Sequence, residues 1–370
     1  MNYTLTPSFD TAAFMRDHWG KQPLLIRNAF DFSSGVPVDA AQILGLATNP
    51  DAQARLIAYQ NSKWTLKRSP LATLPKASVP NWTVLVQNVE LAVPAANALL
   101  RQFAFARYAE LDDLMVSYAT TGGGVGAHVD SYDVFLLQAQ GQRRWRISQQ
   151  TDLECVPKLP LKILKDFRAE QEWVLNPGDM LYLPPHVAHE GVALGEVGDG
   201  CLTYSIGYRA PRLHDALDDA LGMLASEDGE DHSPQLKLNA HSAHAAQPAQ
   251  LTPTDVSCYR AAINAWLDDG VLEEHLGCVL TRANREHAVP APRAKLNAAK
   301  AITLPAGTRM LYSQGFVFIE GFAFAAEGSD WVVLSQLANA RVLEAPRLNE
   351  LSDDAQGIVQ DWLQEGWCVQ

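Results

Sequence analysis

Two histidines and one aspartate are the residues of this chain whose types and spacing are most informative. His128 and Asp130 lie two positions apart at the head of an apolar stretch, and His189 follows later in the chain. Two imidazoles and one carboxylate form the facial triad that holds Fe(II) and leaves coordination positions open for other molecules. Because residues i and i+2 of a strand point to the same side, His128 and Asp130 can bind one ion from a single strand. A third ligand must then come from elsewhere in the chain.

The surroundings of these residues favour a metal site over a chance occurrence. A histidine two positions before an aspartate, taken alone, indicates no more than a surface histidine beside a turn. Here the pair follows the glycine-rich bend 122–126 and precedes an apolar run, and His189 follows two prolines that restrict the direction of the backbone. His186 belongs to the same turn as His189, so the sequence alone does not decide which of the two is the third ligand.

The glycine run has a second interpretation, as a dinucleotide fingerprint. Gly122, Gly124 and Ala127 satisfy the spacing GxGxxA. That fingerprint requires a following helix, whose N-terminus meets the pyrophosphate. The text after Ala127 is β-branched and aromatic instead, so we expect the glycines to let the backbone bend beside a metal.

Three arginines follow in the strand-like text QRRWRIS (142–148). An Fe(II) oxygenase that uses 2-oxoglutarate must hold the distal carboxylate of that co-substrate, and a guanidinium matches a carboxylate with two parallel donors. Arg143 is the candidate for this role. We expect Arg144 on the opposite face and Arg146 on the inner face again, an assignment that depends on the register of the strand. A solvated strand face is the alternative for each of them.

Length and composition limit the class of protein. A chain of 370 residues is long enough for two or three domains, and 47% hydrophobic and 19% charged residues are ordinary for a soluble protein. Because it lacks a run of about eighteen apolar residues and the layout of a secretory signal, we expect no membrane span. Five scattered cysteines without a CxxC pair predict reduced thiols in the cytoplasm. The net charge of −13 argues against direct binding of nucleic acid.

The elements that must position the candidate residues lie in a β-rich part of the chain, from about residue 82 to 209. Short apolar runs there are separated by turn signals such as NPGD and paired prolines, which is typical of a barrel or sandwich. A double-stranded β-helix, the jelly roll of the cupin type, fits this pattern because its open mouth can hold a metal between facing strands. A helix over 8–22 and a strand over 23–30 are predicted ahead of it.

The pattern becomes largely helical after Pro211. The predicted elements are helices over 213–225, 254–270 and 271–285, strands over 308–313 and 316–324, and helices over 329–343 and 352–367, with a linker over 239–253. We therefore expect a mainly β plus α protein in three parts. These are an oxygenase barrel over 1–210, a helical region over 211–290 and a winged-helix-like domain over 291–370.

Three segments carry a resemblance to a known family. The texts MVSYATTGGGVGAHVDSYDVFLLQAQGQRRWRI (115–147), GDMLYLPPHVAHEG (178–191) and TYSIGYRAP (203–211) resemble the JmjC-type ribosomal oxygenases, and among these the bacterial arginine hydroxylases. The likeness extends over nearly the whole chain. It implies a JmjC barrel, a helical dimerisation region that makes a homodimer, and a C-terminal winged helix.

The same resemblance implies roles for individual residues. His128, Asp130 and His189 would be the iron ligands, Arg143 would bind the distal carboxylate of 2-oxoglutarate, and Ser117 would add a hydroxyl to that carboxylate. Fe(II), 2-oxoglutarate and O2 are the implied cofactor and co-substrates. The implied reaction is hydroxylation of the β-carbon of an arginine in a large-subunit ribosomal protein.

Other functions remain open at this point. One alternative is a related JmjC enzyme that acts on another residue, as a histidine hydroxylase or an N-methyl demethylase. Another is a non-catalytic cupin with a winged helix that regulates transcription. The region 301–370 carries nine carboxylates and three arginines, a charge that repels DNA and suits a basic ribosomal protein. Acidic candidates for contact with a substrate near the barrel mouth are Asp112, Asp113 and Asp133.

Overall fold

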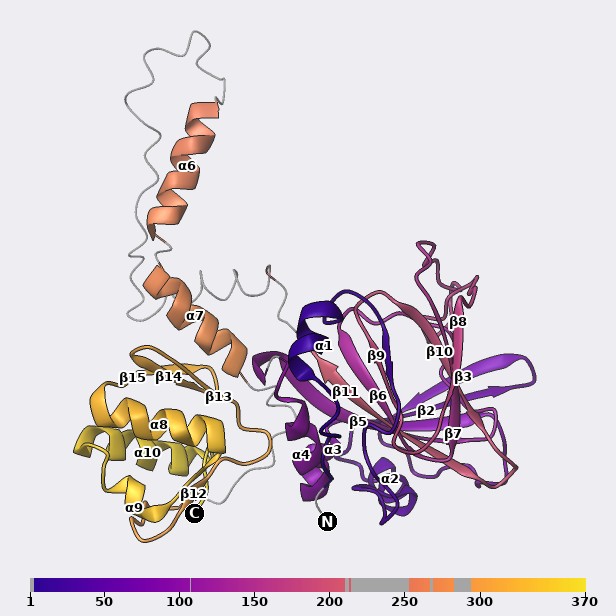
Figure 1. Ribbon diagram of the computed structural model, residues 1–370, viewed down its shortest axis with the longest axis horizontal. Helices are drawn as coiled ribbons and strands as arrows, with labels where there is room; N and C mark the ends of the chain where they lie inside the picture. Colours follow the sequence, from indigo (N-terminus) through magenta and orange to yellow (C-terminus); the bar gives the residue numbers. More distant parts are fainter. Residues whose placement is uncertain (1–2, 107, 210–212, 214–252, 267–268, 283–293) are drawn as a thin grey trace. The chain divides into compact units, whose positions relative to one another are not determined.

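The structure is a computed structural model, and it describes residues 3–106, 108–209, 213, 253–266, 269–282 and 294–370. The chain separates into two compact units, residues 1–210 and 211–370 (Figure 1). No helix in the described ranges combines the length and apolar character needed to cross a membrane.

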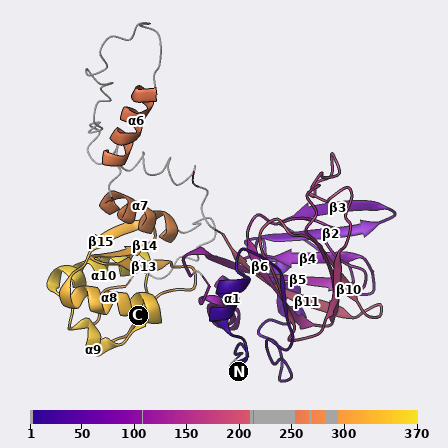
Figure 2. The same cartoon turned by 45° about the horizontal axis from the view of Figure 1, so that its top comes forward.

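The first unit is a barrel made of two antiparallel sheets. The large sheet has the strand order β1-β9-β6-β11-β5-β4-β2-β3, and the small sheet has the order β10-β7-β8. The strands are β1 (Leu24–Ile26), β2 (Ala54–Gln60), β3 (Lys63–Arg68), β4 (Trp82–Val86), β5 (Leu111–Thr120), β6 (Asp133–Gln140), β7 (Gln142–Ser148), β8 (Gln171–Leu175), β9 (Met180–Leu183), β10 (Ala188–Leu194) and β11 (Gly200–Tyr208). Figure 2 shows the strands β5, β4, β2 and β3 of the large sheet lying side by side, in the order that their hydrogen bonds give. This arrangement confirms the predicted double-stranded β-helix.

Short helices cover the outer face of the large sheet. They are α1 (Thr11–Asp17), α2 (Ala40–Ala47), α3 (Val89–Ala92) and α4 (Pro94–Leu100), followed by two 3₁₀ turns, Arg101–Phe103 and Tyr108–Glu110. Their apolar side chains, among them Phe14 and Ile43, join the outward-facing residues of the central strands in the main core. Burial of this outer layer leaves the inner face of the sheet free to carry polar side chains toward the pocket.

The hairpin of β2 and β3 extends the large sheet beyond the predicted β-rich region. The chain turns at Asn61 and Ser62, whose φ angles of 51° and 60° match a two-residue hairpin loop of type I′. A search for apolar runs does not detect β3, because its sequence KWTLKR is rich in charged residues. The predicted helix over 8–22 and the strand over 23–30 are present but shorter, as α1 and β1.

The second unit combines helices with small sheets. Its elements are α6 (Pro253–Trp266), α7 (Asp269–Thr281), β12 (Ile302–Thr303), β13 (Met310–Ser313), β14 (Phe316–Ile319), β15 (Phe322–Ala325), α8 (Gly328–Ala340), β16 (Val342–Leu343), α9 (Ala345–Leu348) and α10 (Asp353–Glu365). The predicted single strand over 316–324 is two strands, because Glu320 and Gly321 both have positive φ and turn the chain. A buried cluster that includes Trp362 and Val333 forms the core of this unit.

The remaining predictions for the second unit are untested. The predicted helix over 213–225 and the linker over 239–253 fall almost entirely outside the described residues. The three-part division of the chain and the winged-helix character of its last part stay predictions.

Candidate metal centre

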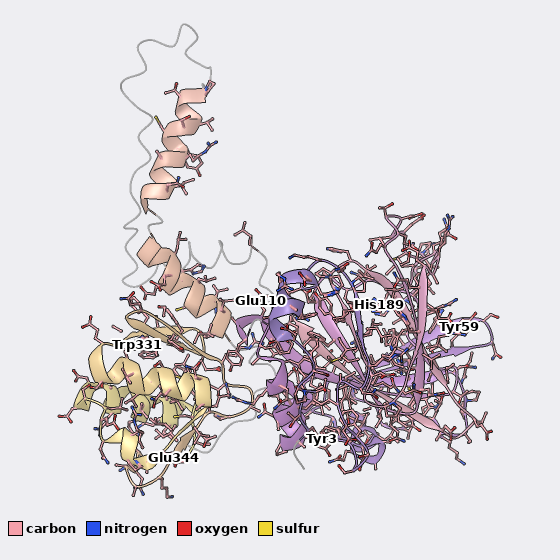
Figure 3. All side chains as sticks on the ribbon, in the orientation of Figure 1. Tyr3, Tyr59, Glu110, His189, Trp331 and Glu344 are labelled. Atoms are coloured by element: carbon pink, nitrogen blue, oxygen red, sulfur yellow. The ribbon has the colours of Figure 1, made fainter. Side chains whose placement is uncertain are left out.

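Three predicted ligands meet in one place inside the barrel. The ligand atoms of His128, Asp130 and His189 lie within 4.8 Å of one another. Nε2 of His189 is 3.6 Å from Oδ2 of Asp130, and the two imidazole rings are 4.2 Å apart between centroids. Figure 3 shows His189 among the barrel strands. His186 is exposed and has a φ of 66°, so the turn directs it away from this group.

The backbone fixes the two histidines relative to each other. His128 and His189 form an isolated antiparallel bridge, in which each amide N–H donates to the other carbonyl oxygen at 2.9 Å. The sequence predicted that His128 and Asp130 lie on one strand, but residues 128–130 form no regular strand. The bridge nevertheless places His128 beside Asp130 and His189 in one group. A Cβ on Gly124 would lie 2.5 Å from the carbonyl oxygen of Gly191, so this close approach requires glycine.

Both imidazoles have the orientation of metal ligands. Nδ1 of His128 lies 3.0 Å from the carbonyl oxygen of Gly126, and Nδ1 of His189 lies 2.9 Å from that of Val187. A carbonyl oxygen only accepts, so each Nδ1 carries the proton and each Nε2 is free to bind a metal. Burial, and then the neighbouring His128, lower the pKa of His189 to about 4. His189 is therefore neutral near pH 7.

A pocket extends from these three residues along the inner face of the barrel. Arg143 of β7 is 4% exposed and lines it, and its Nε and Nη2 have no hydrogen-bond partner among the described residues. Ser117 of β5 also lines the pocket, is buried, and donates to the carbonyl oxygen of Thr203 at 3.4 Å. A buried guanidinium with free donors is costly unless a ligand satisfies it.

The register of β7 corrects one prediction. Arg143 and Trp145 line the pocket, whereas Arg144 and Arg146 do not. Nε of Arg146 donates to Oε2 of Glu190 at 2.9 Å outside the pocket. The expectation that Arg146 faces inward was wrong, because side chains alternate with a period of two and an interval of three changes the face.

Four residues form what we call the mouth of the pocket: Asp112, Asp113 and Tyr132, which are half-buried, and Arg209, which is exposed. Nε of Arg209 lies 3.3 Å from Oδ2 of Asp112, and its guanidinium lies over the ring of Tyr132. Burial, and then the neighbouring Asp112, raise the pKa of Asp113 to about 6. The third acidic candidate, Asp133, lies outside the pocket, where it accepts a hydrogen bond from the hydroxyl of Tyr182.

Arg55 is a pocket residue that the sequence reading missed. It lies on β2, opposite Leu85 of β4, which in turn pairs with Ser117 of β5, so these three side chains share the inner face. The signal for it was a single arginine inside the apolar strand ARLIAYQ.

The comparison with protein families agrees with this geometry. The sequence profile of the JmjC domain matches residues 98–216, which include the three candidate ligands, Arg143 and Ser117. The chain carries a JmjC domain.

Curated relatives of this chain include a probable ribosomal oxygenase of Haemophilus influenzae, which is 39% identical over 223 residues, 59% of this chain and 54% of the relative. The ribosomal protein uL16 3-hydroxylase of Escherichia coli is 34% identical over 218 residues, 59% of this chain and 57% of the relative. The chain thus matches little more than half the length of these relatives.

Solved structures share the fold over the whole chain. The X-ray structure of E. coli ycfD is 24% identical, covers 100% of both chains and has a TM-score of 0.87. The structure of the E. coli ribosomal oxygenase YcfD in complex with cobalt and 2-oxoglutarate is also 24% identical, covers 99% of both chains and has a TM-score of 0.84.

Proposed function

We propose that this JmjC protein is an Fe(II)- and 2-oxoglutarate-dependent hydroxylase that acts on the β-carbon of an arginine in a large-subunit ribosomal protein. The observation that carries the proposal is the convergence of His128, Asp130, His189 and the unpartnered Arg143 in one pocket. The relatives support the substrate class, since one of them is a uL16 3-hydroxylase. The cobalt and 2-oxoglutarate complex of YcfD supports the cofactor and co-substrate.

The residues present fit both the metal and the co-substrate. Two imidazoles and one carboxylate suit Fe(II), and a set of three protein ligands leaves positions for other molecules. The free buried donors of Arg143 suit a dicarboxylic acid, whose distal carboxylate accepts two parallel hydrogen bonds. Ser117 lies on the same inner face and adds a hydroxyl. When bound, the iron supplies the oxidative chemistry that couples O2 and 2-oxoglutarate to attack on an unactivated C–H bond.

The protein's own residues hold and orient the reactants. The carbonyl oxygens of Gly126 and Val187 hold each imidazole with its Nε2 toward the site. Arg143 fixes the far end of the co-substrate, which sets its orientation and closes that end of the pocket. Asp113, at the other end, offers a carboxylate to an incoming guanidinium.

The surface of the C-terminal part supports a basic protein partner. Within 301–370, the exposed charged residues are all acidic: Glu327, Glu344, Glu350, Asp353, Asp354, Asp361 and Glu365. Arg341 is buried there, and Arg347 pairs with Glu350 at 2.8 Å. Such a surface repels nucleic acid and attracts cationic proteins, as most ribosomal proteins are.

The test is incubation of the purified protein with Fe(II), 2-oxoglutarate and E. coli uL16, followed by peptide mass spectrometry. We expect a gain of about 16 Da on one arginine, placed on the β-carbon by fragmentation and NMR. Modification of a histidine, or loss of a methyl group from a lysine, would instead support one of the alternative JmjC activities. Succinate formation without modification of any ribosomal protein would refute the proposed substrate.

The remaining expectations are part of the same proposal. The exposed apolar residues Val256 and Tyr259 on α6 and Leu272 and Leu276 on α7 support a role for the helical region in a homodimer. Five free cysteines support a reducing, cytoplasmic environment. Analytical ultracentrifugation tests the dimer, and Leu276→Glu should weaken it.

A further inference from the structure

Arg55 is a cation in the pocket without an assigned role. It belongs neither to the metal ligands, nor to the co-substrate contact, nor to the mouth. Burial lowers the pKa of its guanidinium, and the carboxylates that act on it through space are Asp113 and Asp130. An arginine still keeps its charge in proteins under these conditions. The pocket therefore holds a second guanidinium, half-buried and with a buried Nε, supplied by the hairpin of β2 and β3.

The donors of Arg55 lack strong acceptors. Its Nε has no hydrogen-bond partner, and its Nη2 donates to Sδ of Met115 at 3.4 Å, a weak acceptor. Among the described residues, none of the pocket carboxylates lies within ion-pair distance of it. Arg209, by comparison, already pairs with Asp112. A half-buried guanidinium whose buried Nε lacks a partner is suited to an acceptor that arrives with a ligand.

The proposed reaction places such an acceptor close to Arg55. An arginine that is oxidised at its β-carbon must bring that carbon to the metal, and the backbone carbonyl oxygen of the same residue lies within about 3–4 Å of the β-carbon. The carbonyl thus enters the pocket with the reacting carbon and loses its hydrogen bonds to water. A carbonyl left without a donor there bears the full cost of desolvation.

We propose that Arg55 is a substrate-positioning residue that donates hydrogen bonds to the backbone carbonyl oxygen of the residue being hydroxylated. This inference rests on the proposed function. It gives the pocket two complementary contacts with one substrate residue, the carboxylate of Asp113 for the side chain and Arg55 for the backbone. The two contacts hold the β-carbon between them, which explains why a donor and an acceptor share the pocket without pairing.

The test uses the uL16 peptide that the wild-type protein hydroxylates, with Arg55→Met and Arg55→Lys variants. Loss of a charged hydrogen bond should lower kcat/KM for the peptide by about 10- to 100-fold in Arg55→Met, with a smaller loss in Arg55→Lys, which keeps a cation. Hydroxylated peptide per succinate should also fall, because a misplaced β-carbon uncouples the reaction. Arg68→Met is the matched control, since Arg68 is the exposed cross-strand neighbour of Arg55, and its activity should remain within about twofold of wild type.

A modified peptide identifies the carbonyl. Replacing the amide that follows the target arginine by an ester weakens that arginine's carbonyl as an acceptor, and should lower kcat/KM for the wild type several-fold. In Arg55→Met the same replacement should have little further effect, since the partner is gone. An equal ester penalty in both proteins would overturn the inference, as would a rise in the KM for 2-oxoglutarate as the main effect of Arg55→Met.

Two controls separate the possible failures. Thermal unfolding of Arg55→Met checks that the variant is folded, and Arg55→Lys gives a second variant with a similar shape. If the wild type hydroxylates no arginine, the proposed function fails. If the wild type hydroxylates arginine and Arg55→Met does so with unchanged coupling, only the role of Arg55 is refuted.

Discussion

The metal end of the pocket and its mouth are built in opposite ways. At the metal end, paired backbone hydrogen bonds join His128 to His189, and a carbonyl oxygen orients each ring. At the mouth, Asp113 is half-buried without an ion pair among the described residues, and its pKa is raised to about 6. Fixed ligands give a metal its geometry before it arrives. Groups that bind a substrate must instead keep part of their hydrogen-bonding capacity free until the substrate enters.

The contrast between the two ends fails first if metal binding does not depend on the three ligands. His189→Ala should lower succinate formation by at least about 1,000-fold, because two ligands do not hold Fe(II) in a productive geometry. Removal of metal by a chelator should have the same effect on the wild type and be reversed by Fe(II). Isothermal titration with Co(II) measures the lost affinity. His186→Asn is the control, since His186 is exposed and asparagine tolerates its positive φ, and it should bind metal as the wild type does.

The co-substrate contact is next in expected size. Arg143→Met should raise the KM for 2-oxoglutarate by about 100-fold, because a bidentate charged contact is lost in a buried site. Metal binding should change little in this variant. Arg144→Met, on the opposite face of the same strand, should leave the KM near the wild-type value. Equal effects of the two substitutions would mean that the register of β7 differs from the one described here.

The activity of the mouth should respond to pH near the raised pKa of Asp113. A raised pKa means that Asp113 loses its charge as the pH falls through about 6, so kcat/KM for a cationic peptide should rise by about tenfold from pH 5 to pH 7 and then level off. Asp113→Asn should remove this step and lower the plateau by about 10- to 30-fold. Asp112→Asn should move the step to lower pH, since it removes a neighbouring negative charge. A step that persists in Asp113→Asn would assign the titration to another group.

The smallest expected effect concerns the stability of the protein, through a buried carboxylate that contacts β5 beside the mouth residue Asp113. Glu90 of α3 is 5% exposed and accepts from the amide N–H of Leu114 at 2.9 Å. Burial raises its pKa to about 7. Between about pH 4.5 and 7 the folded state keeps a proton that the unfolded state has released, so the free energy of unfolding falls as the pH rises through this range. Glu90→Gln should therefore add roughly 1–3 kcal/mol to the free energy of unfolding at pH 8 and almost none at pH 5.

Denaturant unfolding at the two pH values measures this difference. Glu172→Gln on β8 is the control, since Glu172 is exposed and its substitution should change stability equally little at both pH values. If Glu90→Gln lowers stability at pH 8, the carboxylate is a net stabilising group at the back of the mouth.

The sequence by itself determined the chemistry of the metal end. A histidine and an aspartate two positions apart, a distal histidine, an arginine in a strand and the jelly-roll pattern were all readable, because they depend on residue type and short spacing. The acidic composition of residues 301–370 was also fixed by the sequence. None of these features requires knowledge of which distant strands pair.

The tertiary structure decided what depends on direction and on distant pairing. The turn before β10 gives His186 a positive φ and brings His189 to the site, and the pleat of β7 separates Arg143 from Arg146. Asp113 and Asp133 are equal candidates in the sequence, yet only Asp113 lines the pocket. Arg55 reaches the pocket because β2 pairs with β4 and β4 with β5. Such pairings join segments far apart in the chain, and each one sets which face of a strand looks inward.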